Sequence, residues 1–534
     1  MRYLPFLLVL AAFGLFLWGA QSWVWFYIPA GVFGLLGLIG IYDLVQTRHA
    51  LWRNFPLLAR TRWLAEELRP FLRSYIVESE TEGRPFNHED RAMVYRRAKD
   101  VASVEPFGSH LDIDKPPYEW VAHSISAKTA PGHDFRVLVG GKQCKQPYDC
   151  SVLNISAMSF GALGARAIES LNRGAAMGHF YHDTGEGGVS RYHRIGGGDL
   201  VWEIGSGYFG CRADDGSFDA DKFARTATDP QIRMIELKLS QGAKPGHGGV
   251  LPGHKVSAEI AEARGIAMGQ TCVSPPHHSA FSTPRELLEF IQKLRDLSGG
   301  KPTGFKLCIG HRWEFLAIVK AMLETGIKPD YIVVDGAEGG TGAAPAEFLD
   351  HVGAPLRDGL VFVRNALVGA GLRDEIRIAA SGKLLSAFSI ASTMAIGADW
   401  VNTARGFMFS LGCIQSLQCH TNRCPTGIAT QDAGRQRGLV VSDKAKRIAQ
   451  FHKNTLHALA EVVGAAGCTH PSQLKPAHIT HRVTADLAHP ADEVYKLLTP
   501  GQLLTEPDKT HLASDWNRAQ IDSFEPSLQS APVA

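Results

Sequence analysis

The chain has almost no net charge and few cysteines for its length. Its 534 residues carry 55 Lys and Arg against 53 Asp and Glu, a formal net charge of +2, so no global field attracts nucleic acid. Nine cysteines are too few for a disulfide scaffold in a chain of this size, which favours a reducing compartment. We therefore expect no nucleic-acid partner.

The sequence also lacks a dinucleotide fingerprint. Glycines at positions 31, 34, 37 and 40 fall within an apolar segment, and the GEGG and GHGG groups have the wrong spacing for a G-x-G-x-x-G motif. Many of the 55 glycines cluster in short groups such as TGEGG and EGGTG, which mark turns where backbone approaches a ligand closely. We therefore expect no bound NAD(P)H.

One long apolar segment lies at the N-terminus. Residues 3–42 are almost wholly apolar apart from Gln21 and Ser22, and a membrane crossing needs about 20 residues. We expect two helices, roughly 4–20 and 23–43, that form a transmembrane hairpin within residues 1–46. A cleaved signal peptide is the alternative, but Trp18 disturbs the cleavage pattern and a second apolar run follows at once.

The charges around this hairpin predict its orientation. Arg2 precedes it, several arginines follow it, and its tip is uncharged. The positive-inside rule then places both ends in the cytoplasm. We expect an inner-membrane protein that is anchored through residues 4–43 and whose globular part faces the cytoplasm.

Short apolar runs alternate with helical patterns between residues 150 and 410, which is typical of a parallel sheet covered by helices. The eight runs are residues 152–158, 179–183, 234–240, 270–274, 304–309, 331–336, 376–381 and 400–404. Eight strands predict a (βα)8 TIM barrel, and the stretch 190–232 is interpreted as an excursion from it. We expect a connector at 47–150, the barrel domain at 151–435, and a helical C-terminal extension and tail at 436–534.

Polar and glycine-rich residues follow most of these strands. Glu186 follows the second run, Gln241 and Lys244 follow the third, and Gly339 and Gly340 follow the sixth. Turns explain the glycines but not a charged residue at almost every strand end. The sequence therefore predicts a site at the C-terminal mouth of the barrel, where barrel enzymes keep their chemistry.

The loops after the last two strands commonly bind phosphate in such barrels. Ser381, Gly382 and Lys383 follow the seventh strand, and Ala404 and Arg405 follow the eighth. They supply backbone N–H groups, a hydroxyl and two cations. This pattern predicts a phosphate site, with ordinary surface charges as the alternative.

Lys306 lies inside an apolar strand. A buried ammonium needs an anionic or electron-rich partner. A flavin ring, which gains negative charge on reduction, fits that need, and a structural salt bridge fits it equally well.

Three cysteines crowd the loop after the eighth strand, at Cys413, Cys419 and Cys424. Three thiolates so close together indicate a metal site. Zinc with His420 as the fourth ligand is the main alternative, but structural zinc usually shows ligand pairs two to four residues apart and a second such pair. Three ligands without a fourth cysteine favour a 3Fe-4S cluster over a 4Fe-4S cluster.

Several longer motifs resemble the FMN-binding synthase domain of glutamate synthase. They cover about residues 150–435 in the family's order: SAMSFGAL (156–163), TGEGG (184–188), SQGAKPG (240–246), the SPPHH run, GGTGA (339–343) and GCIQSLQCHTNRCPTGIATQD (412–432). The resemblance implies an FMN-containing (βα)8 barrel with a 3Fe-4S cluster on Cys413, Cys419 and Cys424.

The resemblance also implies roles for individual residues. Glu186 would act as acid or base, Lys244 would contact a carboxylate or carbonyl, and Gln241 would help to bind substrate. His247, which departs from the family pattern, is a candidate for substrate binding or for titration near neutral pH, with a solvated loop histidine as the alternative. These roles suit the reduction of 2-iminoglutarate, which needs hydride, charge pairing and a proton donor. The residues expected to hold FMN are Ser156, Ala157, Met158, Ser159, Lys306, Gly339, Gly340, Ser381, Gly382, Lys383, Ala404 and Arg405.

The chain departs from the family pattern near the substrate. His247 and Val250 stand where the family usually has Glu and Gln, and Ser381 and Lys383 replace an acidic residue and a glycine. The glutamine-hydrolysing domain, with its N-terminal cysteine, is not expected here. We therefore expect a 2-oxo acid and ammonia as substrates, with electrons from a donor protein such as ferredoxin or a reductase subunit.

Three hypotheses follow. The first is a membrane-anchored FMN and 3Fe-4S oxidoreductase acting on CH-NH2 donors, which reductively aminates 2-oxoglutarate, or a related 2-oxo acid, to glutamate. The second keeps the cofactors but assigns another substrate or a membrane electron-relay role. The third is a zinc-stabilised membrane scaffold built on a decayed barrel.

Overall fold

The structure is a computed structural model that describes residues 2–102 and 104–527. The chain divides into two compact units, Met1–His88 and Glu89–Ala534. Residues 528–534 of the predicted tail lie outside the described residues.

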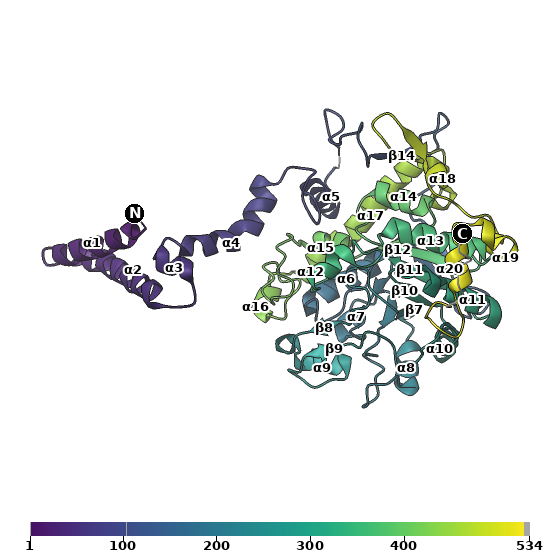
Figure 1. Cartoon of the computed structure of the whole chain (residues 1–534), viewed down its shortest axis with the longest axis horizontal. Coiled ribbons are helices and arrows are strands. Elements are labelled where there is room, and N and C mark those ends of the chain that lie inside the picture. The colour runs from purple at the N-terminus through teal and green to yellow at the C-terminus, as the bar shows by residue number, and fades with distance from the viewer. Residues whose placement is uncertain (1, 103, 528–534) are drawn as a thin grey trace. The chain divides into compact units, whose positions relative to one another are not determined.

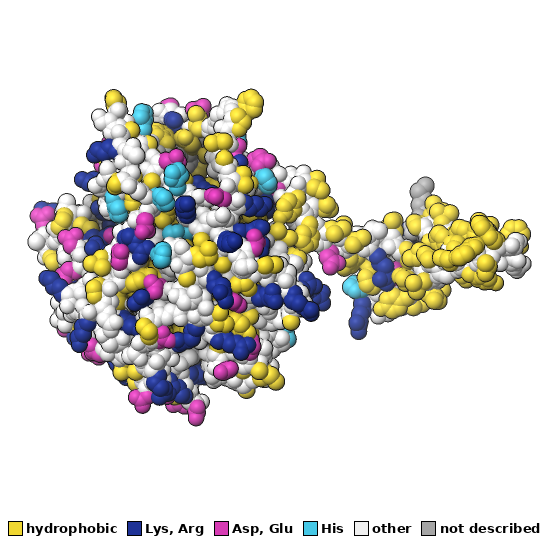
Figure 2. Space-filling view, turned by 180° about the vertical axis from the view of Figure 1, so that it is seen from behind, with side chains coloured by type: hydrophobic (Ala, Val, Ile, Leu, Met, Phe, Trp, Pro, Cys, Tyr) yellow, Lys and Arg dark blue, Asp and Glu magenta, His cyan; other side chains and the backbone are white. Residues whose placement is uncertain are grey.

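The first unit begins with two apolar helices, α1 (Leu4–Gly19) and α2 (Tyr27–Val45), joined through the short helix η1 (Val24–Phe26). The rings of Phe16 and Phe33 stack with centroids 5.5 Å apart. Gly34 faces Phe13, Gly37 faces Leu10 and Gly40 faces Phe6, so these three glycines of α2 pack against α1 and the two helices run antiparallel. Apolar side chains cover this pair (Figure 2).

By length and composition, the helical segment Val24–Val45 is long and apolar enough to cross a membrane, whereas α1 is shorter. Asp43, near the end of α2, is fully buried. Its carboxylate accepts hydrogen bonds from Arg60 at 2.6 Å and from the backbone N–H of Leu57 at 3.0 Å. This contact fixes the turn between the hairpin and the helices α3 (Ala50–Asn54), α4 (Arg60–Leu72) and η2 (Arg73–Val77).

Eight parallel strands of the second unit close into a barrel in the order β4, β5, β6, β7, β10, β11, β12, β13 and back to β4 (Figure 1). This confirms the predicted (βα)8 fold. The strands are β4 (Leu153–Ile155), β5 (His182–Asp183), β6 (Leu200–Ile204), β7 (Ile232–Lys238), β10 (Thr303–Leu307), β11 (Tyr331–Asp335), β12 (Arg377–Ser381) and β13 (Trp400–Thr403).

Two assignments within that prediction are wrong. The run 270–274 forms β9 (Cys272–Val273), which pairs with β8 (Val250–Leu251) in a separate two-stranded sheet. The missing barrel strand is β6, inside the stretch interpreted as an excursion. Trp202 of β6 stacks outward on Phe223, whereas Glu203 points inward to Lys306, so both faces of this short strand are buried.

Helices cover the outside of the barrel. The principal ones are α6 (Ala165–Gly178), α8 (Ala220–Ala227), α10 (Pro284–Leu297), α11 (Arg312–Thr325), α13 (Leu356–Gly369), α14 (Ala387–Ala395) and α15 (Arg405–Leu411). The long helix α17 (Val441–Ala465) packs on α6, α14 and α15. Shorter helices are α7 (Arg191–Arg194), η3 (Gly253–Lys255), α9 (Ala258–Arg264), α12 (Ala346–His351) and α16 (Ala433–Gln436).

The flanking segments form small additional sheets. β2 (Arg136–Val139) and β3 (Tyr148–Ser151) make a hairpin directly before β4. β1 (Glu119–Val121) pairs with β14 (Ile479–Arg482), which pairs with β15 (Ala488–Pro490), so the connector and the C-terminal extension share one sheet. The remaining helices are α5 (His88–Ala98), η4 (Pro471–Gln473), η5 (Pro476–His478), α18 (Ala491–Val494), α19 (Gln502–Thr505), η6 (Pro507–Lys509) and α20 (Ala513–Arg518).

Candidate active site

Three polar side chains meet at the C-terminal mouth of the barrel. Lys238 ends β7, and its Nζ lies 3.2 Å from a carboxylate oxygen of Glu186, which follows β5. The same Nζ lies 3.3 Å from the amide oxygen of Gln241. The strand ends thus bring together Glu186 and Gln241, which the sequence predicted, around Lys238, which it did not.

Glu186 is held as a carboxylate. Burial opposes its ionisation, but the cations Lys238, Arg264 and Lys244 outweigh that effect and lower the pKa of Glu186 to about 2. Ser274 also donates a hydrogen bond to it at 3.4 Å. A group with this pKa is ionised at neutral pH, so in this arrangement Glu186 suits a cationic partner better than it suits proton donation.

Lys244 and His247 lie on the loop after β7. The side chain of Lys244 is buried and its Nζ contacts the carbonyl oxygen of Gly248 at 3.4 Å. Burial lowers the pKa of Lys244, partly offset by Glu186. The ring of His247 is exposed, and its Nδ1 lies 2.7 Å from the Gly248 carbonyl oxygen.

A charged cluster fills the barrel below this mouth. The ammonium of Lys306 pairs with Glu203 and lies 3.3 Å from a carboxylate oxygen of Glu236. Asp183 completes the group, since ligand oxygens of Asp183, Glu203 and Glu236 all lie within 4.8 Å of one another. The structure therefore shows the salt bridge that the sequence left as one of two possibilities for Lys306.

The cluster has more carboxylates than cations. Burial, followed by the charges of Asp183 and Asp335, raises the pKa of Glu236 well above its ordinary value. Burial also raises the pKa of Asp183. One ammonium among three buried carboxylates requires that at least one carboxyl group keeps its proton at neutral pH.

The predicted FMN residues gather where β4, β12 and β13 end. The hydroxyl oxygens of Ser156 and Ser381 lie 3.4 Å apart. Arg405, at the start of α15, donates a hydrogen bond of 2.7 Å to the carbonyl oxygen of Thr341. A Cβ atom placed on Gly340 would lie 2.8 Å from Nε of Arg405, so the arginine approaches this loop where there is no side chain.

The other predicted FMN residues belong to the same strand ends. Ala157, Met158 and Ser159 follow β4, and the N–H of Met158 points to the carbonyl oxygen of Asp183 at 3.4 Å. Gly339 donates to the carbonyl oxygen of Gly336 at 2.9 Å. Gly382 and Lys383 follow β12, and Ala404 immediately precedes α15.

The three cysteines lie in the loop after α15. Cys413 and Cys424 are buried and Cys419 is half-buried. The hydroxyl of Tyr95 donates to the carbonyl oxygen of Cys413 at 2.5 Å. Burial raises the pKa of Cys413 to about 11 against the opposing charge of Arg405, whereas hydrogen bonds from Thr426 and neighbouring backbone outweigh burial and lower the pKa of Cys424.

The spacing of these sulfurs differs from that of a zinc site. Tetrahedral Zn–S bonds of about 2.3 Å place two sulfurs roughly 3.8 Å apart. In residues 2–102 and 104–527, the group of three metal-ligating side chains with ligand atoms within 4.8 Å is the acidic one around Lys306, not the cysteines. The cysteine loop is therefore too open for one tetrahedral ion.

The conserved region of glutamate synthase matches residues 140–469 of the chain. The chain belongs to the glutamate synthase family. Its match therefore runs from the hairpin before β4 to the end of α17 and includes every predicted site residue.

Named relatives agree with this assignment. The glutamate synthase large subunit-like protein YerD of Bacillus subtilis (strain 168) is 37% identical over 488 residues, covering 84% of this chain and 93% of that protein. The archaeal-type glutamate synthase [NADPH] of Thermotoga neapolitana is 33% identical over 314 residues, 58% of each chain. Among solved structures, a flavocytochrome b2 variant with pyruvate bound aligns with 14% identity and a TM-score of 0.41, covering 83% of this chain and 92% of that one.

Sequence reasoning about this glutamate synthase family member missed several charged residues. Lys238, Glu203 and Glu236 were not recognised, nor was Lys255, whose Nζ donates to the carbonyl oxygen of Cys419 at 2.9 Å. A signal was present, because Glu203 and Glu236 each interrupt a run of apolar residues. Charged residues at inward positions of two neighbouring strands are expected to pair with an inward cation such as Lys306.

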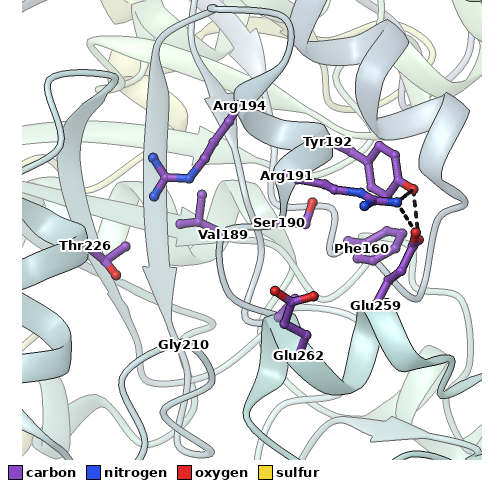
Figure 3. Close-up of a pocket in the computed structure, with 11 residues that line it drawn as sticks. Phe160, Val189, Ser190, Arg191, Tyr192, Arg194, Gly210, Thr226, Glu259 and Glu262 are labelled. Carbon is purple, nitrogen blue, oxygen red and sulfur yellow. Dashed lines mark hydrogen bonds and ion pairs between the residues drawn. The ribbon is translucent and has the colours of Figure 1, made fainter.

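A surface cavity of about 250 Å³ lies beside this site rather than in it (Figure 3). Its arginines are already paired, Arg191 with Glu259 and Arg194 with Asp229. Phe160, which follows the predicted FMN residues, forms part of its wall. None of its lining residues is one of the predicted site residues, so it is not the predicted substrate site.

Proposed function

We propose that this glutamate synthase family oxidoreductase is membrane-anchored, carries FMN and a 3Fe-4S cluster, and reductively aminates 2-oxoglutarate to glutamate with free or delivered ammonia. Electrons come from a donor protein such as ferredoxin or a reductase subunit. The observation that carries the proposal is the group of Glu186, Lys238, Gln241 and Lys244 at the barrel mouth.

The charges of this group match the proposed substrates. A 2-oxo diacid carries two carboxylates, and Lys238 and Lys244 offer two ammonium groups to pair with them. Glu186, kept ionised by the surrounding cations, offers negative charge to ammonium or to the protonated imine. Burial lowers the pKa of Lys244 and makes it a stronger acid than an ordinary lysine. Lys244 is therefore a candidate for the proton donor, a role that the family resemblance had implied for Glu186.

The residues present fit FMN. When bound, FMN supplies the hydride chemistry that imine reduction requires. Ser156 and Ser381 present hydroxyl groups at adjoining strand ends. Arg405 places a cation by the glycine loop where a phosphate is expected, and Lys383 lies close enough to act electrostatically on Glu338 at the start of that loop. Lys306, already neutralised by Glu203 and Glu236, would face the ring from the barrel interior while holding those carboxylates in place.

The cysteine loop fits a cluster better than a single zinc ion. Cys413, Cys419 and Cys424 are spaced too widely for one tetrahedral ion, as expected for ligands to three separate irons. Cys424 is favoured as a thiolate by the hydroxyl of Thr426 and by neighbouring backbone. Lys255 and Arg405 contribute positive charge near these sulfurs.

The N-terminal hairpin supports attachment to the inner membrane with the barrel in the cytoplasm. Segment Val24–Val45 meets the length and composition of a span. Several apolar side chains of α1 are exposed, among them Leu7, Leu8 and Leu15. Such outward apolar surface on both helices suits lipid better than water.

A second candidate keeps the cofactors but uses another 2-oxo acid. Gly249 packs against the carboxylate of Glu186, which places the neighbouring Val250 beside the substrate region. Val250 has 43% of its side chain exposed and offers no hydrogen bond, where the family usually has an amide. An acid without the distal carboxylate would tolerate that loss better.

One experiment separates these readings. The full chain is purified anaerobically in detergent, its flavin and iron are quantified, the flavin is reduced, and its reoxidation is followed with 2-oxoglutarate plus ammonium, with each alone, and with shorter 2-oxo acids. Reoxidation that requires both 2-oxoglutarate and ammonium, with glutamate formed in equal amount, supports the first proposal. Reoxidation by a shorter acid instead selects the second, and protein without flavin refutes both.

A further inference from the structure

A buried lysine lies against the cysteine loop. Lys255 ends the short helix η3 and has 4% of its surface exposed. Its Nζ donates a hydrogen bond of 2.9 Å to the backbone carbonyl oxygen of Cys419. The excursion between β7 and α10 thereby reaches a loop 164 residues later in the chain.

Two other lysines of the site have carboxylate partners that Lys255 lacks in the described part of the chain. Lys306 is paired with Glu203 and Glu236, and Lys238 with Glu186. For Lys255, none of the ion pairs found among residues 2–102 and 104–527 supplies a carboxylate. Burying an ammonium group without a counter-charge costs free energy because the group loses its hydration. A hydrogen bond to one carbonyl oxygen replaces only part of that lost interaction.

Because Lys255 contacts the cysteine loop through the Cys419 carbonyl oxygen, the sulfurs of that loop are candidates for the missing charge. Burial lowers the pKa of Lys255, and negative charge on Cys419 and then on Cys424 opposes that shift, so the ammonium lies within electrostatic reach of both sulfurs. Cys413 has a different cation near it, Arg405. Two cations thus act on the cysteine loop: Arg405 on Cys413, and Lys255 on Cys419 and Cys424.

We propose that Lys255 is a positioning residue for the iron–sulfur cluster, whose ammonium neutralises the negative charge at Cys419 and Cys424 and favours reduction of the cluster. The proposal rests on the proposed function only in requiring a cluster on these cysteines. Its chemical basis is the unpaired buried charge together with the hydrogen bond that fixes the Cys419 backbone.

The redox consequence follows from charge. Each electron delivered by the donor protein would add one negative charge to a cluster held by the three cysteines, and Lys255 forms and breaks no covalent bond. A cation fixed beside the ligands stabilises the reduced form more than the oxidised form, so its removal lowers the reduction potential. Replacement by a neutral side chain should change the ratio of oxidised to reduced cluster at a fixed potential at least tenfold, about 59 mV for one electron.

The test compares full-length variants purified anaerobically in detergent. Lys255→Met removes the charge, Lys255→Gln removes it but keeps a donor, and Lys255→Arg keeps it. Lys446→Met, at an exposed lysine on α17, controls for the loss of one unit of net charge. Iron and sulfide content, the thermal midpoint, and a potentiometric titration followed by electron paramagnetic resonance are measured for each.

A lowered potential in Lys255→Met and Lys255→Gln, with Lys255→Arg and Lys446→Met close to the unmodified chain, supports the proposal. Loss of the cluster in both neutral variants with retention in Lys255→Arg supports it too. An unchanged potential in the neutral variants, or cluster loss in all three folded Lys255 variants, overturns it. Iron-free unmodified protein would instead refute the proposed cluster itself, so the two failures are distinguishable.

Discussion

The Nζ atom of Lys238 lies 3.2 Å from Oε1 of Glu186, and both side chains are mostly buried, with 11% and 16% exposed. β7 supplies the lysine and the loop after β5 supplies the glutamate. The pair joins two strand ends that are not neighbours in the barrel, because β6 lies between them. The ion pair therefore stabilises the arrangement of the strand ends at the barrel mouth and also determines the local charge there.

Lys238→Met should impair both stability and substrate reduction. Breaking a buried ion pair leaves the remaining charge uncompensated, which costs about 3 kcal/mol. Lys509→Met, which removes an exposed lysine 2.8 Å from Glu506, should cost less than about 0.5 kcal/mol. Thermal midpoints and single-turnover flavin reoxidation measure the two effects. Equal midpoints in the two variants would show that the pair does not stabilise the mouth.

The low pKa of Glu186 predicts an acid-dependent contribution to stability. Since folding lowers this pKa from 4.5 to about 2, the contribution is complete above about pH 4.5 and is lost as pH falls toward 2. Its full size is about 3 kcal/mol at neutral pH. The midpoint of Glu186→Gln should therefore approach that of the unmodified chain between pH 6 and pH 3. A constant difference for Glu186→Gln would contradict the prediction.

The contribution of Glu236 to folding stability should change with pH in the opposite direction to that of Glu186. Its pKa is raised in the folded state by burial and by neighbouring carboxylates, so its contribution is favourable below the unfolded pKa of about 4.5 and becomes increasingly unfavourable as pH rises. Glu236→Gln, which resembles the protonated form, should gain stability relative to the unmodified chain between pH 5 and pH 8. The measurement is the difference in thermal midpoint, and a difference that shrinks with pH would show that Glu236 is ionised in the cluster around Lys306.

The barrel was predictable because seven of its strands are short apolar runs with polar residues at their ends. β6 escaped because Glu203 breaks its apolar pattern and glycines flank it on both sides. The buried charge of Glu203 is explained by its ion pair with Lys306 of β10, which the sequence alone does not reveal. The run 270–274 was assigned to the barrel instead of β6 because the two-residue strand β9, which pairs with β8 outside the barrel, has a local composition similar to that of a short barrel strand.

Site residues that belong to a local sequence motif were predictable. Site residues whose role comes from an ion pair or hydrogen bond with a residue distant in sequence were not. Glu186, Gln241 and the three cysteines lie in glycine-rich or cysteine-rich segments, and the local sequence of each segment is enough to predict a functional site. Lys238 and Lys255 lie in ordinary surroundings, and their importance comes from partners more than 50 residues away. Such contacts depend on the closure of the barrel and on the excursion after β7, which periodicity does not reveal.

Cys419→Ser should remove the cluster while leaving the barrel folded. Serine oxygen is a poor ligand for iron–sulfur chemistry compared with thiolate, and the half-buried position of Cys419 leaves room for the change. Iron and sulfide should fall to background, while flavin content and the circular dichroism of the barrel persist. Cys144→Ser, at a thiol outside the loop whose pKa is raised by burial, should retain iron. Iron bound equally by both variants would place the metal elsewhere.

The apolar surface of α2 should decide whether the chain stays in the membrane. Leu35 and Leu38 are 61% and 66% exposed, in the middle of the segment that is long enough to cross a bilayer. Arginine near the centre of a span costs about 3 kcal/mol per residue, so Leu35→Arg with Leu38→Arg should release the chain from a carbonate-resistant membrane fraction. Leu504→Arg, at an exposed leucine of α19, should remain in that fraction. An unmodified chain that is itself extracted by carbonate would rule out the anchor and leave the apolar hairpin to a protein partner.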